Sequence, residues 1–168
     1  MPMVPFMQKF PELGARETRS VQMTGVPELP DGDYGFIELY CDEPNCDCRR
    51  AFIQVWRHDT GGKIWATLSY GWESLGFYRK WARGSCDVRE LMGASLAEFN
   101  AQTRYSPALL LVFQALLKSP EYVERIKNHY HMFRAAVDRE QAGSNARRLA
   151  PMRRSQGRNP KSRRPPWF

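Results

Sequence analysis

Hydrophobic and polar positions follow two different periods along this chain, and the change falls close to Tyr70. Before Tyr70, apolar residues recur at the short intervals of β-strands in four runs, which are residues 20–24, 34–40, 51–57 and 64–70. After it, apolar residues recur about every 3.6 positions, which is the period of an amphipathic helix. The pattern therefore predicts a sheet first and helices after it.

The central runs predict an antiparallel meander. Gly61 and Gly62 lie between 51–57 and 64–70, and glycine supplies the positive φ that a tight hairpin needs. We therefore expect these two runs to pair as a hairpin. A cysteine-rich loop at 41–50 joins the preceding strand to the hairpin, so it should lie at the opposite end of the sheet from the two glycines.

Four helices are predicted after the sheet. The first covers residues 75–83 and is rich in aromatic residues. Ser95-Leu96-Ala97-Glu98 has the S-x-x-E form of a capping box and predicts a second helix start. Ser106-Pro107 and Ser119-Pro120 open two more, because proline fits the first turn of a helix. The last helix is expected to end near Arg139.

Together these elements predict the α+β class, with a three- to four-stranded antiparallel sheet followed by about four packed helices. Residues 1–142 form a single globular domain in this interpretation, and residues 1–20 are irregular or marginally helical. Residues 143–168 contain several prolines, few apolar residues and no periodicity. Such a composition is typical of a flexible, disordered tail.

Charge is distributed unevenly between these two parts. The net charge is +7, but residues 147–168 hold eight Lys and Arg with no acidic residue, while the first 146 residues are nearly neutral. A basic arm ending in Trp167 and Phe168 suits nucleic acid, because arginine binds phosphate and an aromatic ring can stack on an unpaired base. The alternative is a tail that only solubilises the chain or binds an acidic partner. The predicted nucleic-acid contacts are Arg49, Arg50, Arg147, Arg148, Arg153, Arg154, Arg158, Arg163 and Arg164.

Three of the four cysteines, Cys41, Cys46 and Cys48, are clustered with the spacing C-x4-C-x-C. Such clustering without a secretory signature favours a bound metal over disulfides. Zinc is preferred to an iron–sulfur cluster, which uses longer spacings and more cysteines. A redox-active thiol pair, unligated thiols and a local disulfide are the alternatives.

A structural zinc site takes four ligands in a tetrahedron. Cys86, in the turn Gly-Ser-Cys-Asp, is the predicted fourth ligand. His58, His131, Asp47 and a water molecule are weaker candidates, and a water would leave the site open.

The last predicted helix carries two further histidine positions of interest. His129 lies near its apolar face and is expected to be packed and hydrogen-bonded. Lys127, His131 and Arg134 are spaced as a basic stripe, which we interpret as an ordinary charged exterior.

No targeting segment is visible in the sequence. The N-terminal residues lack an apolar core, and the apolar stretch Ala108–Leu117 is too short to span a bilayer. We therefore expect a soluble protein of a reducing cytoplasm. The sequence also lacks a P-loop, a dinucleotide fingerprint, H-E-x-x-H and G-x-S-x-G, so no motif marks an enzyme class.

Three strings resemble a family of small uncharacterised bacterial proteins with a YCDExxCDCRR-type signature. They are Tyr40–Arg50, Tyr70–Ser74 and Arg125–Tyr130. The likeness covers about residues 34–135 and implies no activity. Gly157–Pro160 is similar to the opening of the SEC-C zinc motif, but the cysteines that should follow are absent, which suggests a degenerate remnant.

The leading hypothesis is a non-enzymatic zinc-binding protein that contacts nucleic acid through its basic tail. A protein–protein adaptor is the second. A metal-dependent enzyme, with an open position on zinc that activates water, is the third. It ranks last because no convincing general base stands near the cysteines in the sequence.

Overall fold

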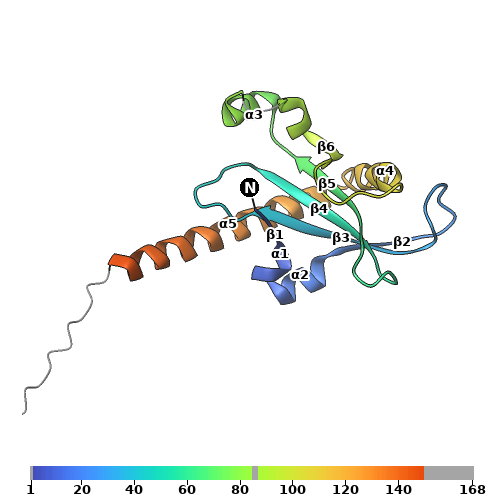
Figure 1. The fold of residues 1–168 in the computed structure, drawn as a ribbon, viewed down its shortest axis with the longest axis horizontal. Coiled ribbons are helices and arrows are strands. Elements are labelled where there is room, and N and C mark those ends of the chain that lie inside the picture. Colours follow the sequence, from blue (N-terminus) through green and yellow to red (C-terminus); the bar gives the residue numbers. More distant parts are fainter. Residues whose placement is uncertain (1, 85–86, 150–168) are drawn as a thin grey trace, which may run out of the picture.

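The computed structural model describes residues 2–84 and 87–149, with side chains up to residue 145. It is α+β, and its sheet is antiparallel (Figure 1). The strands are β1 (Met3–Pro5), β2 (Arg19–Met23), β3 (Gly32–Cys41), β4 (Arg50–Arg57), β5 (Ile64–Gly71) and β6 (Gly93–Leu96). The helices are α1 (Phe6–Lys9), α2 (Pro11–Glu17), α3 (Leu75–Ala82), α4 (Ser106–Leu116) and α5 (Pro120–Leu149), with a 3-10 turn at Val88–Leu91.

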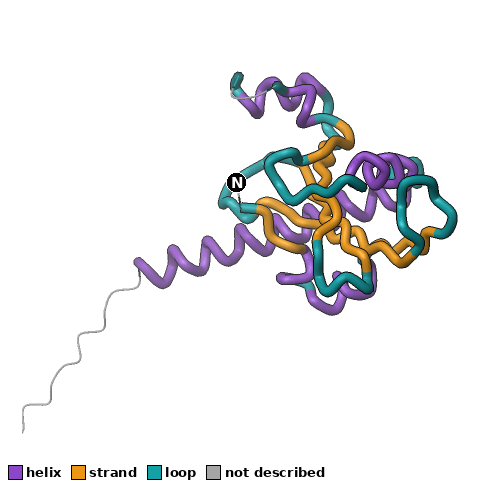
Figure 2. Tube along the Cα trace, turned by 45° about the vertical axis from the view of Figure 1, so that its right-hand side comes forward, coloured by secondary structure: helices purple, strands orange, loops and turns teal. Residues whose placement is uncertain are grey.

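The predicted meander of β3, β4 and β5 is confirmed, and it forms the centre of the sheet. Phe36 and Tyr40 lie on one face of β3, because their positions have the same parity. Phe36 stacks on Phe113 of α4 at 6.2 Å, and Tyr40 contacts Phe133 of α5 at 5.7 Å between ring centroids. Helices α4 and α5 therefore cover the same face of the sheet and bury its core (Figure 2).

The expectation that residues 1–20 are irregular or marginally helical was wrong for strand β1, whereas the short strand expected at 20–24 is present as β2. The N-terminal segment contains β1, α1 and α2, followed by β2. Both β1 and β2 pair with β3. Met3 lies opposite Cys41, so β1 runs beside the end of β3, and the buried Phe6 anchors α1. A three-residue strand and helices of four and seven residues are too short to produce a periodic pattern, which is why the sequence did not show them.

The predicted helix start at Ser95 was also wrong, because this segment is β6. It pairs with the edge of β5, and the backbone N–H of Ala97 donates to Thr67 O at 2.9 Å. Ser95 Oγ donates to Glu90 O instead of capping a helix. A capping box is a local signal, and here the unpaired edge of β5 offers backbone hydrogen bonds that satisfy the segment as a strand.

The turn after β5 brings α3 close to the cysteine loop. Ser74 caps α3, as its Oγ accepts from Phe77 N at 3.2 Å. A Cβ atom at Gly71 would lie 1.9 Å from Leu91 O and 2.5 Å from the hydroxyl of Tyr78, so only glycine fits there. This close approach places Tyr78 against the end of the loop that carries the cysteines.

Helix α5 continues beyond its predicted end near Arg139 and reaches Leu149. Gly143 lies within it, at a cost of about 1 kcal/mol relative to alanine. The residues from 138 to 145 are exposed, and this half of α5 extends away from the sheet (Figure 1). The start of the predicted tail, 143–149, is therefore helical, and 150–168 lie outside the described residues. The division into a domain at 1–142 and a tail stays a prediction.

Within residues 2–84 and 87–149, the sheet has more strands than the three or four predicted, and there are five α-helices where four were predicted. The additional elements are the short N-terminal ones and β6. Within the described part of the chain, no helix combines the length and apolar character needed to cross a membrane.

Candidate metal centre

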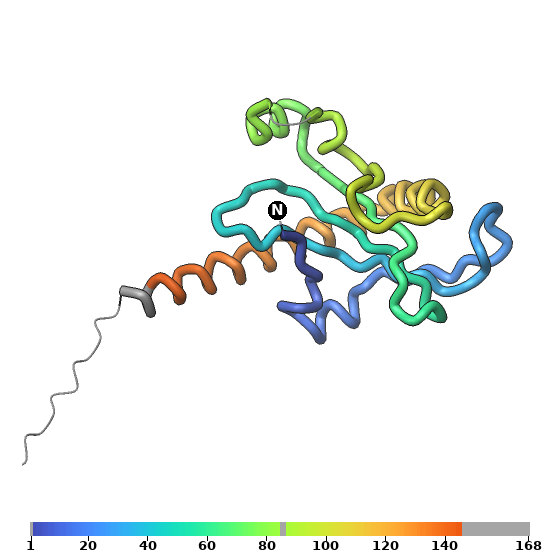
Figure 3. Tube along the Cα trace, in the orientation of Figure 1, coloured from blue at the N-terminus to red at the C-terminus, as the bar shows by residue number. Residues whose placement is uncertain are grey.

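The loop between β3 and β4 lies beside the N-terminal strand β1 (Figure 3). It brings three cysteines together. The Sγ atoms of Cys41, Cys46 and Cys48 all lie within 4.8 Å of one another. None of the three takes part in a disulfide. Cys41 and Cys48 are buried, while Cys46 is partly exposed. Sulfurs this close can bind a single ion, since zinc–sulfur bonds are about 2.3 Å long.

Two residues with left-handed backbone make this convergence possible. Asn45 has φ of 60° and Arg49 has φ of 46°. Cys46 N also donates to Glu43 O at 3.2 Å, which closes a turn between the first two cysteines. Asparagine tolerates this conformation well, but an arginine there is strained and must be held by its surroundings.

Backbone N–H groups are directed at the sulfurs. The N–H of Glu43 hydrogen bonds to Cys41, that of Cys48 to Cys46, and that of Arg50 to Cys48, and each bond lowers the pKa of the thiol that it meets. The donor is in every case two residues beyond the sulfur. Such bonds stabilise the thiolate, which is the form that binds metal.

The three thiols differ in how strongly their thiolate forms are stabilised. A hydrogen bond with the Cys48 side chain lowers the pKa of Cys41 to about 6. The same bond raises the pKa of Cys48, and burial raises the pKa of Cys46. Cys41 is thus the sulfur that loses its proton most readily, while Cys46 and Cys48 hold their protons more tightly. A cation among the sulfurs would release those protons.

Arg134 of α5 clamps the first half of the loop. Its Nη1 donates to Cys41 O at 3.0 Å and to Glu43 O at 2.9 Å, while its Nη2 pairs with Asp138 at 3.0 Å. Its charge also helps to lower the pKa of Cys41. The expectation that Arg134 lies on the charged exterior was wrong, because the residue is buried. Its spacing to Asp138 is that of an ordinary surface ion pair, so the sequence carried no signal of this role.

Tyr130 and Tyr78 hold the second half of the loop, at the strained Arg49. Tyr130 Oη accepts from Arg49 N and donates to Asp47, both at 3.3 Å. Tyr78 Oη donates to Arg49 O at 2.8 Å. Two tyrosines from two helices therefore bind both backbone groups of the residue whose conformation needs support.

The two arginines of the loop, predicted to contact phosphate, have partners within the protein. Arg49 pairs with Asp47 at 2.9 Å and Glu73 at 3.1 Å, and its guanidinium lies 4.6 Å from the ring centre of Phe77. Arg50 Nη2 donates to Ser69 Oγ. These contacts hold the loop on the sheet and on α3, and a role of either arginine in nucleic-acid binding stays a prediction.

The predicted fourth ligand, Cys86, lies outside the described residues. Within the segments that the structure describes, no histidine or carboxylate joins the three cysteines. His58 follows β4 and donates its N–H to Asp33 O, at the hairpin end of the meander. His131 is exposed on α5, as expected. The tail arginines predicted to bind nucleic acid are outside the described side chains.

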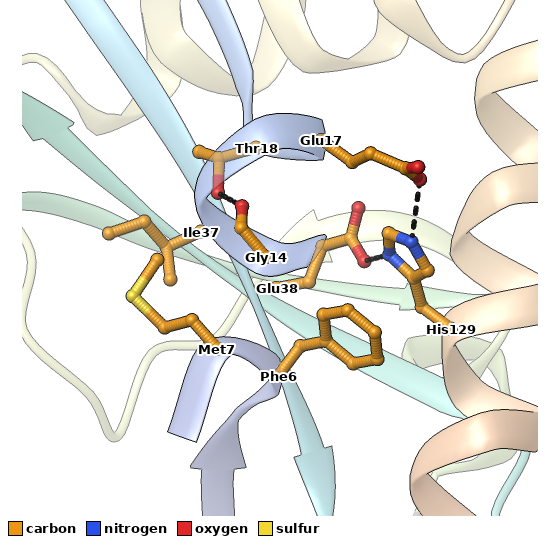
Figure 4. Close-up of a pocket in the computed structure, with 8 residues that line it drawn as sticks. All are labelled: Phe6, Met7, Gly14, Glu17, Thr18, Ile37, Glu38 and His129. Carbon is orange, nitrogen blue, oxygen red and sulfur yellow. Dashed lines mark hydrogen bonds and ion pairs between the residues drawn. The ribbon is translucent and has the colours of Figure 1, made fainter. Parts of the chain in front are cut away.

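A second buried polar cluster surrounds His129 (Figure 4). Its Nδ1 lies 2.7 Å from Glu38 Oε2 and its Nε2 lies 3.0 Å from Glu17 Oε2. The ring of Phe6 stacks on the imidazole at 4.0 Å. Burial lowers the pKa of His129, but the hydrogen bonds and charges of the two carboxylates outweigh it and raise the pKa overall. The prediction of a packed, hydrogen-bonded histidine is confirmed.

The cavity beside His129 has a volume of about 10 Å³, which is room for at most one water molecule. This cluster therefore fastens elements together and leaves no space for a substrate. Comparisons with family models, curated proteins and solved structures found no significant match to this chain. The geometry of the cysteine loop is accordingly the basis for a functional proposal.

Proposed function

We propose that this chain is a non-enzymatic zinc-binding protein in which the ion fastens the β3–β4 loop to the sheet and α5. The supporting observation is the group of three sulfurs within 4.8 Å, each with a backbone N–H that favours its thiolate. Thiolate-rich sites select zinc among the common divalent ions. A reducing cytoplasm, the location we expect, would keep these thiols available.

A structural role is favoured over a catalytic one by the surroundings of the sulfurs. Cys41 and Cys48 are buried, so an ion bound to them is shielded on that side. Asp47, the carboxylate between Cys46 and Cys48, is held by Arg49 and Tyr130. It is therefore poorly placed to serve as a general base for a metal-bound water.

The resemblance to the bacterial family with the YCDExxCDCRR-type signature is retained as part of this proposal. The three strings that carry it have contacts at the loop. Glu73 pairs with Arg49, and Trp72 contacts Tyr130 at 5.2 Å between ring centroids. Tyr130 in turn bonds to Arg49 N. The strings thus belong to one cluster in space, which is the arrangement expected if they serve one site.

Metal content and a thiol count test the proposal. The full chain is purified without chelator and without a polyhistidine tag, and zinc is measured beside reactive thiols. We expect one zinc per chain, with thiols that become reactive only after chelation. Three protected thiols would leave Cys86 outside the site, and four would include it. An absence of metal together with four freely reacting thiols would refute the proposal.

Nucleic-acid contact through the tail is the second part of the proposal. Its support is the concentration of eight basic residues after residue 146. We expect binding of a mixed oligonucleotide to weaken steeply between low and moderate salt, because phosphate contacts release counterions. A chain ending at Leu149 should lose most of this affinity. Affinity insensitive to salt would contradict phosphate contact, and a protein partner retained without the tail would favour the adaptor.

A further inference from the structure

The strands at the two edges of the sheet differ in their residues. At one edge, the outermost strands are β1 and β2, which both pair with β3, and they contain Pro5 and Arg19. At the other edge, β6 pairs with β5 alone, and no further strand of the described chain lies beside it. An uncovered edge presents unpaired N–H and C=O groups, which can pair with another strand.

The register of β6 identifies which backbone groups face outward. Ala97 N donates to Thr67 O, and Ser95 lies opposite Ser69 two positions further along the ladder. In an antiparallel pair, hydrogen-bonded positions alternate. The N–H and C=O of Ser95 therefore point to β5, while those of Ala94 and Leu96 point to the open edge.

This edge lacks the charged side chains and prolines that commonly prevent association. Gly93–Leu96 contains no charge and no proline, although natural edge strands commonly carry lysine or proline. Large apolar side chains lie beyond its two ends, since Met92 is 45% exposed and Phe99 is fully exposed. A groove of about 470 Å³ runs beside the strand, lined in part by Phe52, Leu96 and Phe99. Exposed apolar groups beside an open edge indicate an interaction surface.

We propose that two copies of this chain associate through β6, as antiparallel strands related by a two-fold axis at Ser95. Ala94 of each copy then lies opposite Leu96 of the other. The outward N–H and C=O groups of these residues match in this register, giving four hydrogen bonds between the copies. The edge is thus self-complementary, as a two-fold interface must be.

The side chains beside the strand agree with this register. Met92 of one copy comes level with Glu98 of the other, so the flanking acidic groups do not face each other. The exposed Met92 and Phe99 lie on the same side of the axis in opposite copies and can cover one another. The association joins the two six-stranded sheets into one continuous sheet, and it is independent of the metal centre.

A disulfide at the axis provides the sharpest test. Two Ser95 residues would form a non-hydrogen-bonded pair, with Cα atoms about 4.5 Å apart, which a disulfide can bridge. Ser95→Cys in the full chain should give an intermolecular link between residues 95 under mild oxidation, identified by peptide mass spectrometry. Ser20→Cys, in β2 at the opposite edge of the sheet, is the matched control and should not link. Equal linking by both variants would overturn the proposal.

A second variant avoids any effect on the native thiols. Ala94→Pro removes an outward N–H and leaves the ladder to β5 intact, because the N–H of Ala94 takes no part in it. Sedimentation should show a concentration-dependent dimer for the unmodified chain. The dimer dissociation constant of the variant should be at least about 10-fold higher. Circular dichroism should be the same for both. A monomer at all concentrations would refute the second copy as occupant, and peptide capture by that monomer would assign the edge to a foreign strand.

Discussion

Two buried polar clusters pack against α5, and they differ in whether the cluster contains a cation of the protein's own. At His129, both ring nitrogens meet carboxylates, and Glu38 also accepts from Tyr40 at 2.7 Å. At the cysteine loop, the sulfurs meet backbone N–H groups and one another, and the nearby Arg134 gives its hydrogen bonds to carbonyls. The histidine cluster contains its own cation, whereas the cysteine cluster is arranged for negative charge that a bound cation would balance.

This difference explains why one cluster is interpreted as structural and the other as a metal centre. Buried charges are tolerated where a partner and hydrogen bonds satisfy them. Glu17 of α2 and Glu38 of β3 each lie within hydrogen-bond distance of His129 of α5. Three sulfurs with donors aimed at them gain most from a divalent ion, because only then can all three be thiolates.

The largest expected effect is that of Cys48→Ser. Cys48 is the buried centre of the cluster, and serine is a poor ligand for zinc, so the variant should retain far less than one zinc per chain. We also expect it to lose about 3 kcal/mol or more of unfolding free energy, as is usual when a structural metal is lost. Zinc content and urea denaturation measure the two effects.

Chelation provides the control for this variant. Chelator should destabilise the unmodified chain and leave Cys48→Ser unchanged, since the variant has no metal to lose. If chelator affects the stability of neither protein, the cysteine cluster does not need a cation and the comparison with His129 fails.

His129→Gln should have a smaller effect, of about 3 kcal/mol on unfolding, with zinc content unchanged. The variant leaves the carboxylate of Glu38, which is only 5% exposed, without its cationic partner. Loss of zinc along with stability would show that the two clusters depend on each other.

The pH dependence of this variant sharpens the comparison. The pKa of His129 is raised in the folded state, so its protonation contributes stability that is complete below the unfolded pKa of about 6.5. That contribution is lost as pH rises through the folded pKa. The difference in unfolding free energy between the unmodified chain and His129→Gln should therefore shrink from pH 6 towards pH 9. A difference that grows with pH would contradict the imidazolium assignment.

Arg134→Met comes next, at about 2 kcal/mol, because it leaves the buried carbonyls of Cys41 and Glu43 without a donor. Zinc affinity should fall by about 10-fold, as is typical when a group that orients a ligand is removed. Arg139→Met on the same helix is the matched control, since Arg139 is exposed and should change stability by less than about 0.5 kcal/mol. Equal effects of both variants would show that the contacts of Arg134 with the loop do not stabilise it.

The sequence allowed the central part of the fold and site to be predicted, because those signals are local. Alternation, Gly61-Gly62 and the cysteine spacing each act over a few residues, and β3–β5 and the convergence of three cysteines are as expected. The sequence likewise predicted that His129 would be packed, from its place beside an apolar helix face.

The remaining features depend on contacts between distant residues. Ser95 is a good cap in isolation, but β5 is available only after folding, and it recruits the segment as a strand. Arg134 meets Cys41 from 93 positions away, and nothing near it in sequence distinguishes it from a surface arginine. The same reasoning applies to Glu17 and Glu38, whose meeting at His129 requires that the N-terminal helices are already placed.

Tyr130→Phe has the smallest expected effect and tests whether the clusters are separate. Tyr130 follows His129, yet its hydroxyl serves the loop at Arg49 and Asp47. Loss of the hydroxyl should cost about 1 kcal/mol, because both hydrogen bonds are long and only Arg49 N is left without a partner. Thiol reactivity should rise slightly, while the pH dependence attributed to His129 should not change. A shift in that pH dependence would mean that the loop and the histidine respond as one unit, since the substitution leaves the contacts of His129 in place.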